Sequence, residues 1–241
     1  GLWGNYILKP QSPVYDSMPE LEDLTMKLAE ASGIATAPHG LIMMDDGELA
    51  YITKRMDRGE KGEKYSMLDM CQLTNRLTEH KYRGAYIQLA ETIKKYSSAP
   101  MLDVQRFWEI VIFSWLTGNS DMHCKNFSLI EKGCDGYHLS PAYDLLAVKL
   151  TGINDDDELA MPLVGYGTDE NNAIVGFDRL SFIQAMIDSG ITEKISERII
   201  DKMVSSSHKW GDIIDSSFLD DKLKSDYKSL VQERINRIVK V

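Results

Sequence analysis

Apolar side chains recur at a helical spacing between residues 104 and 116. Positions three and four apart carry seven large apolar side chains: Val104, Phe107, Trp108, Val111, Ile112, Trp115 and Leu116. This period places all seven on one face of an α-helix. The pattern therefore predicts a helix at the centre of a helical core, and Gly118 is expected to end it.

The residues before this helix predict a small sheet and one helix. Asn5–Lys9 has the pattern of a short strand, and Leu41–Met44 and Leu49–Lys54 are two more strands joined by an Asp-Asp-Gly turn. Such a turn between apolar runs favours a hairpin. A helix is predicted in between, where Ser17 and Glu20 are expected to form a capping box. Its apolar face carries Leu21, Leu24, Leu28 and Ala31.

Further helices and a second hairpin are predicted elsewhere. Ser66 or Asp69 is expected to start a helix carrying Leu68, Cys71 and Leu77. A second helix is indicated by the apolar face of Tyr86, Leu89, Ala90 and Ile93. Phe127–Ile130 and Tyr137–Leu139 predict a β-hairpin, joined by a glycine-containing connection. The last part predicts helices that follow Asp178, follow Thr192 and span Leu219–Val239.

The order of these elements predicts an α+β fold with two lobes. Residues 1–58 would form a small, β-rich N-terminal lobe with one helix. Residues 59–241 would form a larger and mostly helical C-terminal lobe. The polar, glycine-containing stretch Gly59–Lys64 suits the boundary or hinge between them.

Composition limits the classes of function that remain open. Of the 241 residues, 43% are hydrophobic and 27% are charged, as in ordinary globular proteins. No apolar run approaches the roughly 18 residues that a membrane span requires. A formal net charge of −10 disfavours direct binding to nucleic acid. The acidic stretch Asp155–Glu158 is expected to be a solvated loop.

The cysteines favour a reducing, cytoplasmic location. Cys71, Cys124 and Cys134 are few, odd in number and widely spaced, which is not typical of a disulfide scaffold. Cys124 and Cys134 could bind a metal together with His123, but no fourth ligand has the spacing of a structural zinc site. We therefore do not favour such a site.

The candidate chemistry lies in the loop that follows the central helix. Residues 116–130 contain five polar side chains in a short stretch: Asn119, Asp121, His123, Lys125 and Asn126. Asp144 follows after the predicted hairpin. An Asp, an Asn five residues later and a second Asp after a hairpin are the arrangement that holds a metal–nucleotide and a substrate hydroxyl in kinase-like phosphotransferases.

The residues alone leave a structural interpretation open. Asn119 and Asp121 could cap a turn, and an Asp and an Asn five residues apart occur by chance in an Asp-rich chain. Lys9 could be a solvated strand end or a lysine that pairs with phosphate. Other chemistries have less support, because G-x-S-x-G, H-E-x-x-H, C-x-x-C and the P-loop motif are all missing from the sequence.

Six segments resemble the HipA-like serine/threonine kinases of bacterial toxin–antitoxin systems. They are NYILKP (5–10), PELEDLTMKLAEASGI (19–34), AYITKRMDR (50–58), DMCQL (69–73), GNSDMHCKNFSL (118–129) and LSPAYDLL (139–146). The resemblance implies an ATP- and Mg-dependent protein kinase with Asp121 as catalytic base and with Asn126 and Asp144 as magnesium ligands. It implies that Lys9 pairs with phosphates and that Lys54, Arg55 and Met56 meet the adenine. The nucleotide pocket would also be lined by His123, Cys124, Lys125 and Tyr143.

The resemblance also implies partners. Family members phosphorylate proteins such as aminoacyl-tRNA synthetases, and a DNA-binding antitoxin restrains them. The resembling segments include neither the N-terminal subdomain nor the phosphate-covering loop of the usual long member. In some systems a separate small protein supplies the subdomain, so such a partner is expected to complete this chain. Two other hypotheses therefore stay open: a catalytically silent kinase-like module that binds an antitoxin or another protein, and a kinase of a small-molecule or lipid hydroxyl.

Overall fold

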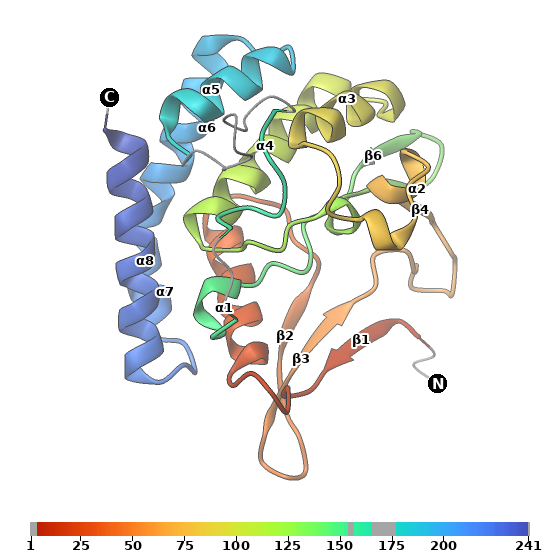
Figure 1. The fold of residues 1–241 in the computed structure, drawn as a ribbon. Coiled ribbons are helices and arrows are strands. Elements are labelled where there is room, and N and C mark those ends of the chain that lie inside the picture. Colours follow the sequence, from red (N-terminus) through yellow and green to blue (C-terminus); the bar gives the residue numbers. More distant parts are fainter. Residues whose placement is uncertain (1–3, 154–156, 165–176, 241) are drawn as a thin grey trace.

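Two small antiparallel sheets and a group of helices build this computed structural model (Figure 1). It describes residues 4–153, 157–164 and 177–240. The fold is α+β, as the sequence predicts. The boundary between two lobes at residue 58 stays a prediction.

The first sheet has the strand order β1-β3-β2. Its strands are β1 (Tyr6–Lys9), β2 (His39–Met43) and β3 (Leu49–Lys54). Lys9 lies opposite Tyr51 in the β1–β3 register, so the two side chains share one face of the sheet. Helix α1 (Met18–Ala31) packs against β2 and β3. The predicted hairpin and both flanking elements are confirmed.

The start of α1 differs from the prediction. Ser17 has a φ of 58° and its side chain makes no capping hydrogen bond. The left-handed backbone at Ser17 is not the extended conformation of a capping serine, so no capping box forms. The carboxylate of Glu20 accepts two hydrogen bonds from Gln11 Nε2, both of 2.9 Å, instead of one from the Ser17 backbone.

The second sheet has the order β4-β5-β6. It contains β4 (Ser66–Asp69), β5 (Ser128–Glu131) and β6 (Tyr137–Leu139), so the predicted hairpin is confirmed. The predicted helix through Leu68 is wrong, because Leu68 pairs with Leu129 of β5. A one-turn helix α2 (Met70–Leu73) follows, and Asp69 caps it together with Gln72. The strand pairing with β5 overrides the local helical pattern.

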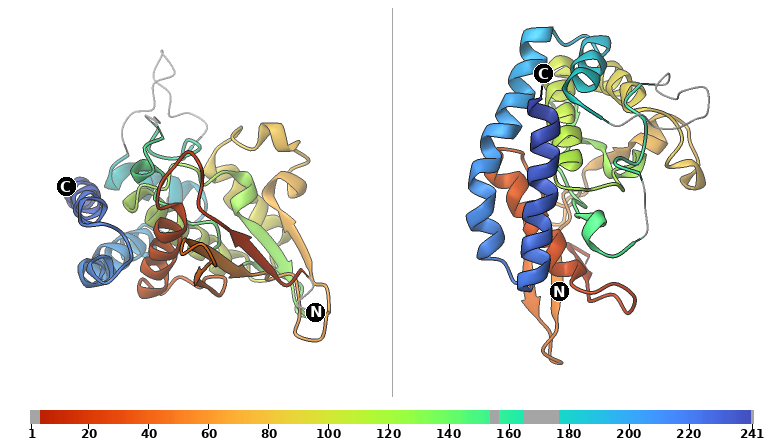
Figure 2. Two further views of the ribbon diagram at one scale, coloured as in Figure 1. Left: turned by 90° about the horizontal axis from the view of Figure 1, so that it is seen from below. Right: turned by 60° about the vertical axis from the view of Figure 1, so that its left-hand side comes forward.

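The central helix of the helical part is α4 (Pro100–Leu116), as the apolar stripe predicts. It contacts α3 (Tyr86–Tyr96), α6 (Glu193–Ser206) and α8 (Asp221–Val239). The remaining elements are α5 (Arg179–Asp188), α7 (Trp210–Asp215) and the short 3₁₀ helices η1 (Thr78–His80), η2 (Cys124–Asn126), η3 (Val148–Leu150) and η4 (Ser207–Lys209). Figure 2 shows α8 lying along one side of the molecule, next to α6 and α7.

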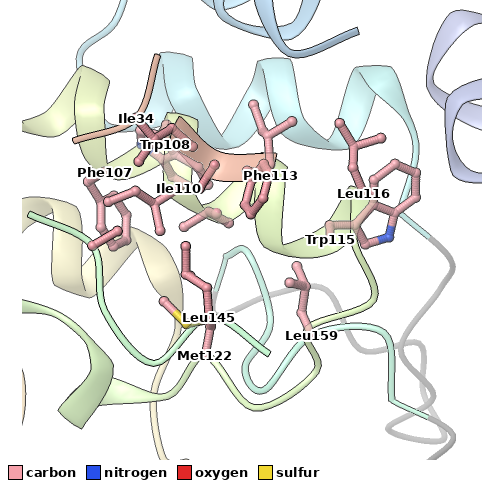
Figure 3. Packing of buried hydrophobic residues seen from close by; sticks show 14 of the residues in the cluster. Ile34, Phe107, Trp108, Ile110, Phe113, Trp115, Leu116, Met122, Leu145 and Leu159 are labelled. Carbon is pink, nitrogen blue, oxygen red and sulfur yellow. The ribbon is translucent and has the colours of Figure 1, made fainter. Parts of the chain in front are cut away.

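The core around α4 also holds the two segments that carry the candidate acids. Met122 directly follows Asp121, Leu145 directly follows Asp144, and both apolar side chains are fully buried. Figure 3 shows Met122 and Leu145 close together below the α4 side chains. Packing of these two anchors fixes the backbone on which the acids are placed.

Glu158 corrects the expectation of a solvated acidic loop; Asp155 and Asp156 of that stretch lie outside the described residues. Its carboxylate forms ion pairs with Arg234 (2.6 Å) and Arg237 (2.5 Å) of α8. It also accepts a hydrogen bond of 3.1 Å from Trp115 Nε1. Both guanidinium groups lie over the Trp115 ring, at 5.0 and 5.3 Å from its centroid.

Replacing Glu158 by Gln is expected to lower the free energy of unfolding by about 2 kcal/mol, because it leaves the buried Arg234 guanidinium without its counter-charge. Urea denaturation measures the change. Glu233→Gln is the matched control, since the exposed Glu233 also pairs with Arg237, at 3.8 Å. An equal change in the two variants would contradict the assignment of a stabilising role to Glu158.

Among the described helices, none is both long and apolar enough to cross a lipid bilayer.

Candidate functional site

A cavity of about 450 Å³ lies between the two sheets. Lys9 and Thr53 face it from the first sheet, and Met67, Asp69 and Ser128 face it from the second. This volume is within the range of small-molecule sites. The cavity therefore combines groups from both halves of the sequence.

Lys9 is the most strongly held cation in this cavity. Its ammonium lies 2.7 Å from Glu22 Oε1 and 3.0 Å from Glu22 Oε2, and it also forms an ion pair with Asp144 Oδ1. The ammonium is 5.7 Å from the centre of the Tyr51 ring. A lysine on a strand paired with a glutamate on the following helix is the ion pair that positions nucleotide phosphates in protein kinases.

Burial controls the protonation of this cluster. Burial raises the pKa of Glu22 to about 7, and the nearby Lys9 charge opposes this rise without cancelling it. Burial on its own would lower the pKa of Lys9, but the Asp144 and Glu22 carboxylates outweigh it and raise that pKa. Lys9 thus keeps its charge, whereas Glu22 changes its charge near neutral pH.

A pH dependence of stability follows from Glu22. The folded protein binds a proton at Glu22 more tightly than the unfolded chain, so this stabilisation is full below pH 4.5 and is lost as the pH rises to about 7. The free energy of unfolding of wild type minus Glu22→Gln is expected to fall by on the order of 2–3 kcal/mol over that window. Urea denaturation at pH 4.5, 5.5, 6.5 and 7.5 measures it. The exposed Glu48→Gln is the control, and a flat difference for Glu22→Gln would contradict the assignment.

Asp144 has an unusual backbone. Its φ is 59°, in the left-handed region that residues other than glycine rarely adopt. Ala142, two residues before Asp144, is fixed to the first half of the chain: Ala142 N donates to Ala35 O at 2.7 Å, and Ala142 O accepts from Ala37 N at 2.9 Å. A residue kept in this conformation by its surroundings is typical of functional sites.

Tyr143 and Lys125 connect Asp144 to the catalytic-looking loop. The Tyr143 hydroxyl donates to the Lys125 carbonyl at 2.7 Å and is 2.6 Å from Ser128 Oγ. Lys125 Nζ forms an ion pair of 2.7 Å with Asp69 Oδ2. Burial raises the pKa of Tyr143, so its hydroxyl stays protonated. These hydrogen bonds and this ion pair hold four cavity-lining residues in place: Asp69, Lys125, Ser128 and Tyr143.

Asp121 lies on the loop between α4 and β5. Its backbone carbonyl accepts a hydrogen bond of 3.0 Å from Asn126 Nδ2, and its Oδ1 accepts one of 2.6 Å from the Tyr82 hydroxyl. The side chain of Asp121 is 45% exposed, so a substrate can reach it. Asn126 is buried, and its amide nitrogen is used inside the loop.

The predicted site residues fall into two groups. Seven of them line the cavity: Lys9, Lys54, Arg55, Met56, Lys125, Tyr143 and Asp144. Asp121, His123, Cys124 and Asn126 lie on the neighbouring loop and do not line it. The thiol of Cys124 is buried, with Arg76 Nη1 at 3.3 Å and Met161 Sδ at 3.6 Å, and burial raises its pKa. Burial lowers the pKa of His123, which favours the neutral imidazole.

Sequence reasoning missed three residues of this site. The sequence patterns give no chemical role to Glu22 or Tyr82, and they predict Asp69 only as the start of a helix. The helical period places Glu22 and Asp23 away from the predicted apolar face, yet α1 buries both acids as well as Leu21 and Leu24. A buried acid requires a partner, and this requirement points to a lysine elsewhere.

Solved structures give the class of the fold. The HipA toxin of Shewanella oneidensis MR-1, solved with HipB and operator DNA, has a TM-score of 0.82 at 20% identity; the match covers 98% of this chain and 58% of that chain. The proinflammatory kinase CtkA of Helicobacter pylori has a TM-score of 0.66 at 15% identity, covering 97% of this chain and 84% of that chain. This chain therefore shares the fold of these two proteins.

Sequence comparison gives the family. The model of the HipA-like C-terminal domain matches residues 3–210, so the chain belongs to that family. Two curated relatives carry the name "Putative kinase". The one from Haemophilus influenzae is 25% identical over 238 residues, and the one from Sinorhizobium fredii is 31% identical over 207 residues. These matches cover 90% and 81% of this chain, but 69% and 48% of the relatives.

Proposed function

We propose that this chain is the core of a serine/threonine kinase that transfers the γ-phosphate of ATP to a protein hydroxyl. The observation that carries the proposal is the Lys9 ammonium, held between Glu22 of α1 and Asp144 on the wall of the cavity. In this arrangement Lys9 can exchange Asp144 for a nucleotide phosphate while it remains fixed by Glu22.

The donor set fits a magnesium ion that is shared with a nucleotide. Asp144 offers a carboxylate and Asn126 an amide oxygen, and Mg²⁺ is bound by one or two such protein oxygens with substrate phosphates as further ligands. Within the part of the chain that is described, no cluster of three or more His, Cys, Asp or Glu residues could hold a metal by itself. When bound, the ion would neutralise charge on the β- and γ-phosphates.

Adenine recognition is assigned to the end of β3. The backbone N–H groups of Lys54 and Arg55 already donate to Pro38 O and Asn5 O, both at 2.8 Å. We therefore assign the contact with the adenine edge to the backbone of Met56, which follows them. The Lys125 ammonium would lie near the nucleotide at the opposite wall of the cavity, because its ion pair with Asp69 holds it there.

Asp121 is assigned the role of general base. A substrate hydroxyl that is hydrogen-bonded to Asp121 would give its proton to the Asp121 carboxylate. The hydroxyl oxygen would attack the γ-phosphorus, and the bond between the γ-phosphorus and the ADP oxygen would break. Asn126 holds the Asp121 backbone, and the buried Met122 anchors the next residue. These contacts position the Asp121 carboxylate, although Asp121 does not itself line the cavity.

Titration calorimetry with ATP and Mg²⁺, followed by transfer of radiolabelled phosphate to a lysate of the source cell, tests the proposal. Binding that depends on Mg²⁺ together with labelling of a protein on Ser or Thr supports it. Binding of a protein partner without any transfer would favour the silent kinase-like module. Labelling of a small molecule or lipid would overturn the protein-kinase assignment.

We also propose two partners, a DNA-binding antitoxin and a small protein or further segment that covers strand β1. Support for the first comes from the HipA structure solved with HipB. The second is supported by the edge strand itself, where Tyr6, Ile7 and Leu8 are 44–47% exposed. Exposed apolar edge strands are templates for pairing with another strand. The three free cysteines suit the cytoplasm as the place of action.

A further inference from the structure

The hydroxyl of Tyr82 occupies one of the two carboxylate oxygens of Asp121, the proposed base. Tyr82 OH donates to Asp121 Oδ1 at 2.6 Å, which is a short, charge-assisted hydrogen bond. The other carboxylate oxygen, Oδ2, lies 4.0 Å from His123 Nε2. A side chain of the protein itself therefore stands where the proposed function places a substrate hydroxyl.

This contact is built into the fold. The Tyr82 ring meets the edge of His123, with 5.1 Å between ring centroids and an interplanar angle of 76°. Lys81 Nζ also contacts this ring, at 4.8 Å from its centroid. Two contacts on the ring hold the phenol in one place, so its hydroxyl is aimed at Asp121.

The segment that carries Tyr82 is also attached to the loop of Asp121. Cys124 N donates to Lys81 O at 3.1 Å. Arg76 Nη1 donates to Arg83 O at 2.7 Å and to Cys124 Sγ at 3.3 Å. The backbone on both sides of Tyr82 is thereby fixed, whereas Tyr82 itself is 48% exposed.

We propose that Tyr82 determines which hydroxyl reaches the base. In the absence of a protein substrate, its phenol occupies Oδ1 of Asp121, keeps water from hydrogen-bonding to that oxygen and so suppresses hydrolysis of ATP. A protein acceptor displaces the phenol because contacts remote from the reacting hydroxyl supply binding free energy, which a water molecule cannot offer. Tyr82 is thus a specificity residue for protein over water, and this inference rests on the proposed function.

The suppressed reaction is the hydrolysis of ATP. A water oxygen attacks the γ-phosphorus, its proton passes to the Asp121 carboxylate, and the bond between the γ-phosphorus and the ADP oxygen breaks, which gives ADP and phosphate. The loss of a hydrogen bond to a charged group corresponds to a change of about tenfold or more in an equilibrium constant. Hydrolysis without an acceptor should rise by that factor when the Tyr82 hydroxyl is removed.

Tyr82→Phe removes only this hydroxyl and keeps the ring between His123 and Lys81. Tyr96→Phe is the matched control, because Tyr96 is 41% exposed and Lys95 Nζ lies 4.8 Å from its ring centroid, outside the site. ADP release is measured with Mg-ATP alone, and phosphate transfer is measured with dephosphorylated casein as acceptor. Tyr82→Phe is expected to raise the kcat for hydrolysis about tenfold at an unchanged KM for ATP, without lowering transfer.

The possible outcomes separate the role of Tyr82 from the kinase assignment. Wild-type turnover with an unchanged rate of hydrolysis in Tyr82→Phe overturns the role of Tyr82 and leaves the kinase assignment intact. A lower rate of hydrolysis shows that Tyr82 instead orients the base, and phosphate found on Tyr82 by mass spectrometry shows that it is itself an acceptor; both overturn the inference. No turnover by either protein overturns the proposed function and this inference together.

Discussion

Replacing Asp121 by Asn is expected to lower the rate of phosphate transfer by about 10²–10⁴-fold, the usual contribution of a general base. The amide oxygen of Asn can still accept the hydrogen bond from Tyr82, and the bond between Asn126 and the backbone of residue 121 remains. The variant therefore loses the group that accepts a proton and keeps the geometry of the loop. Single-turnover transfer from radiolabelled ATP measures the change.

A measurement of the affinity for ATP distinguishes the loss of the base from a general disturbance of the site. Asp121 does not line the cavity, so titration calorimetry should give a dissociation constant for Mg-ATP close to the wild-type value. Asp135→Asn, in the exposed connection between β5 and β6, is the control for a loss of negative charge. Transfer by Asp121→Asn within tenfold of the wild-type rate would contradict the role of base.

Local sequence patterns predict the helices and hairpins well, because their periodicity is itself the physical cause of burial. The stripe from Val104 to Leu116 has one apolar face, and α4 buries that face. The Asp-Asp-Gly turn predicts the β2–β3 hairpin for the same reason, since its geometry is local. These elements require no knowledge of distant residues.

Long-range pairing explains where the sequence fails. Ser66–Asp69 carries a helical pattern, but its strand conformation depends on pairing with β5, about sixty residues later. The hydrogen bond between Lys9 and Asp144 joins residues 135 positions apart, and no period in the sequence records it. Glu22 belongs to the same cluster, and only the three-dimensional structure brings it to Lys9.

The polar loop is an intermediate case. Its residue types predict chemistry because hard oxygen donors and a carboxylate are spaced as phosphotransfer requires. Their spacing does not predict which of them faces the cavity. Cys124 is turned into the core beside Met161, whereas Lys125, the next residue, lines the cavity. Adjacent residues diverge in this way because the 3₁₀ turn η2 points successive side chains in different directions.

The change from Asp144 to Asn is expected to reduce Mg-dependent phosphate transfer by about 10³-fold, because the proposed metal loses its charged ligand. The backbone at residue 144 has a φ of 59°, and Asn tolerates this left-handed conformation almost as well as Asp. Lys9 keeps its ion pair with Glu22 in the variant. Calorimetry should show that the gain in ATP affinity on adding Mg²⁺ is largely lost, while ATP without metal binds at least as tightly as before, because the carboxylate that competes with phosphate for Lys9 is gone.

A second substitution at the same position separates metal binding from backbone strain. Asp144→Ala removes the ligand too, but Ala in the left-handed region costs about 1 kcal/mol of stability that Asn does not. The two variants should therefore be equally inactive and differ in their free energy of unfolding. Asp45→Asn, in the exposed β2–β3 turn, is the charge control. If Asp144→Asn retains the Mg²⁺ effect and Asp144→Ala does not, the site depends on the backbone conformation at residue 144, and the carboxylate is not a metal ligand.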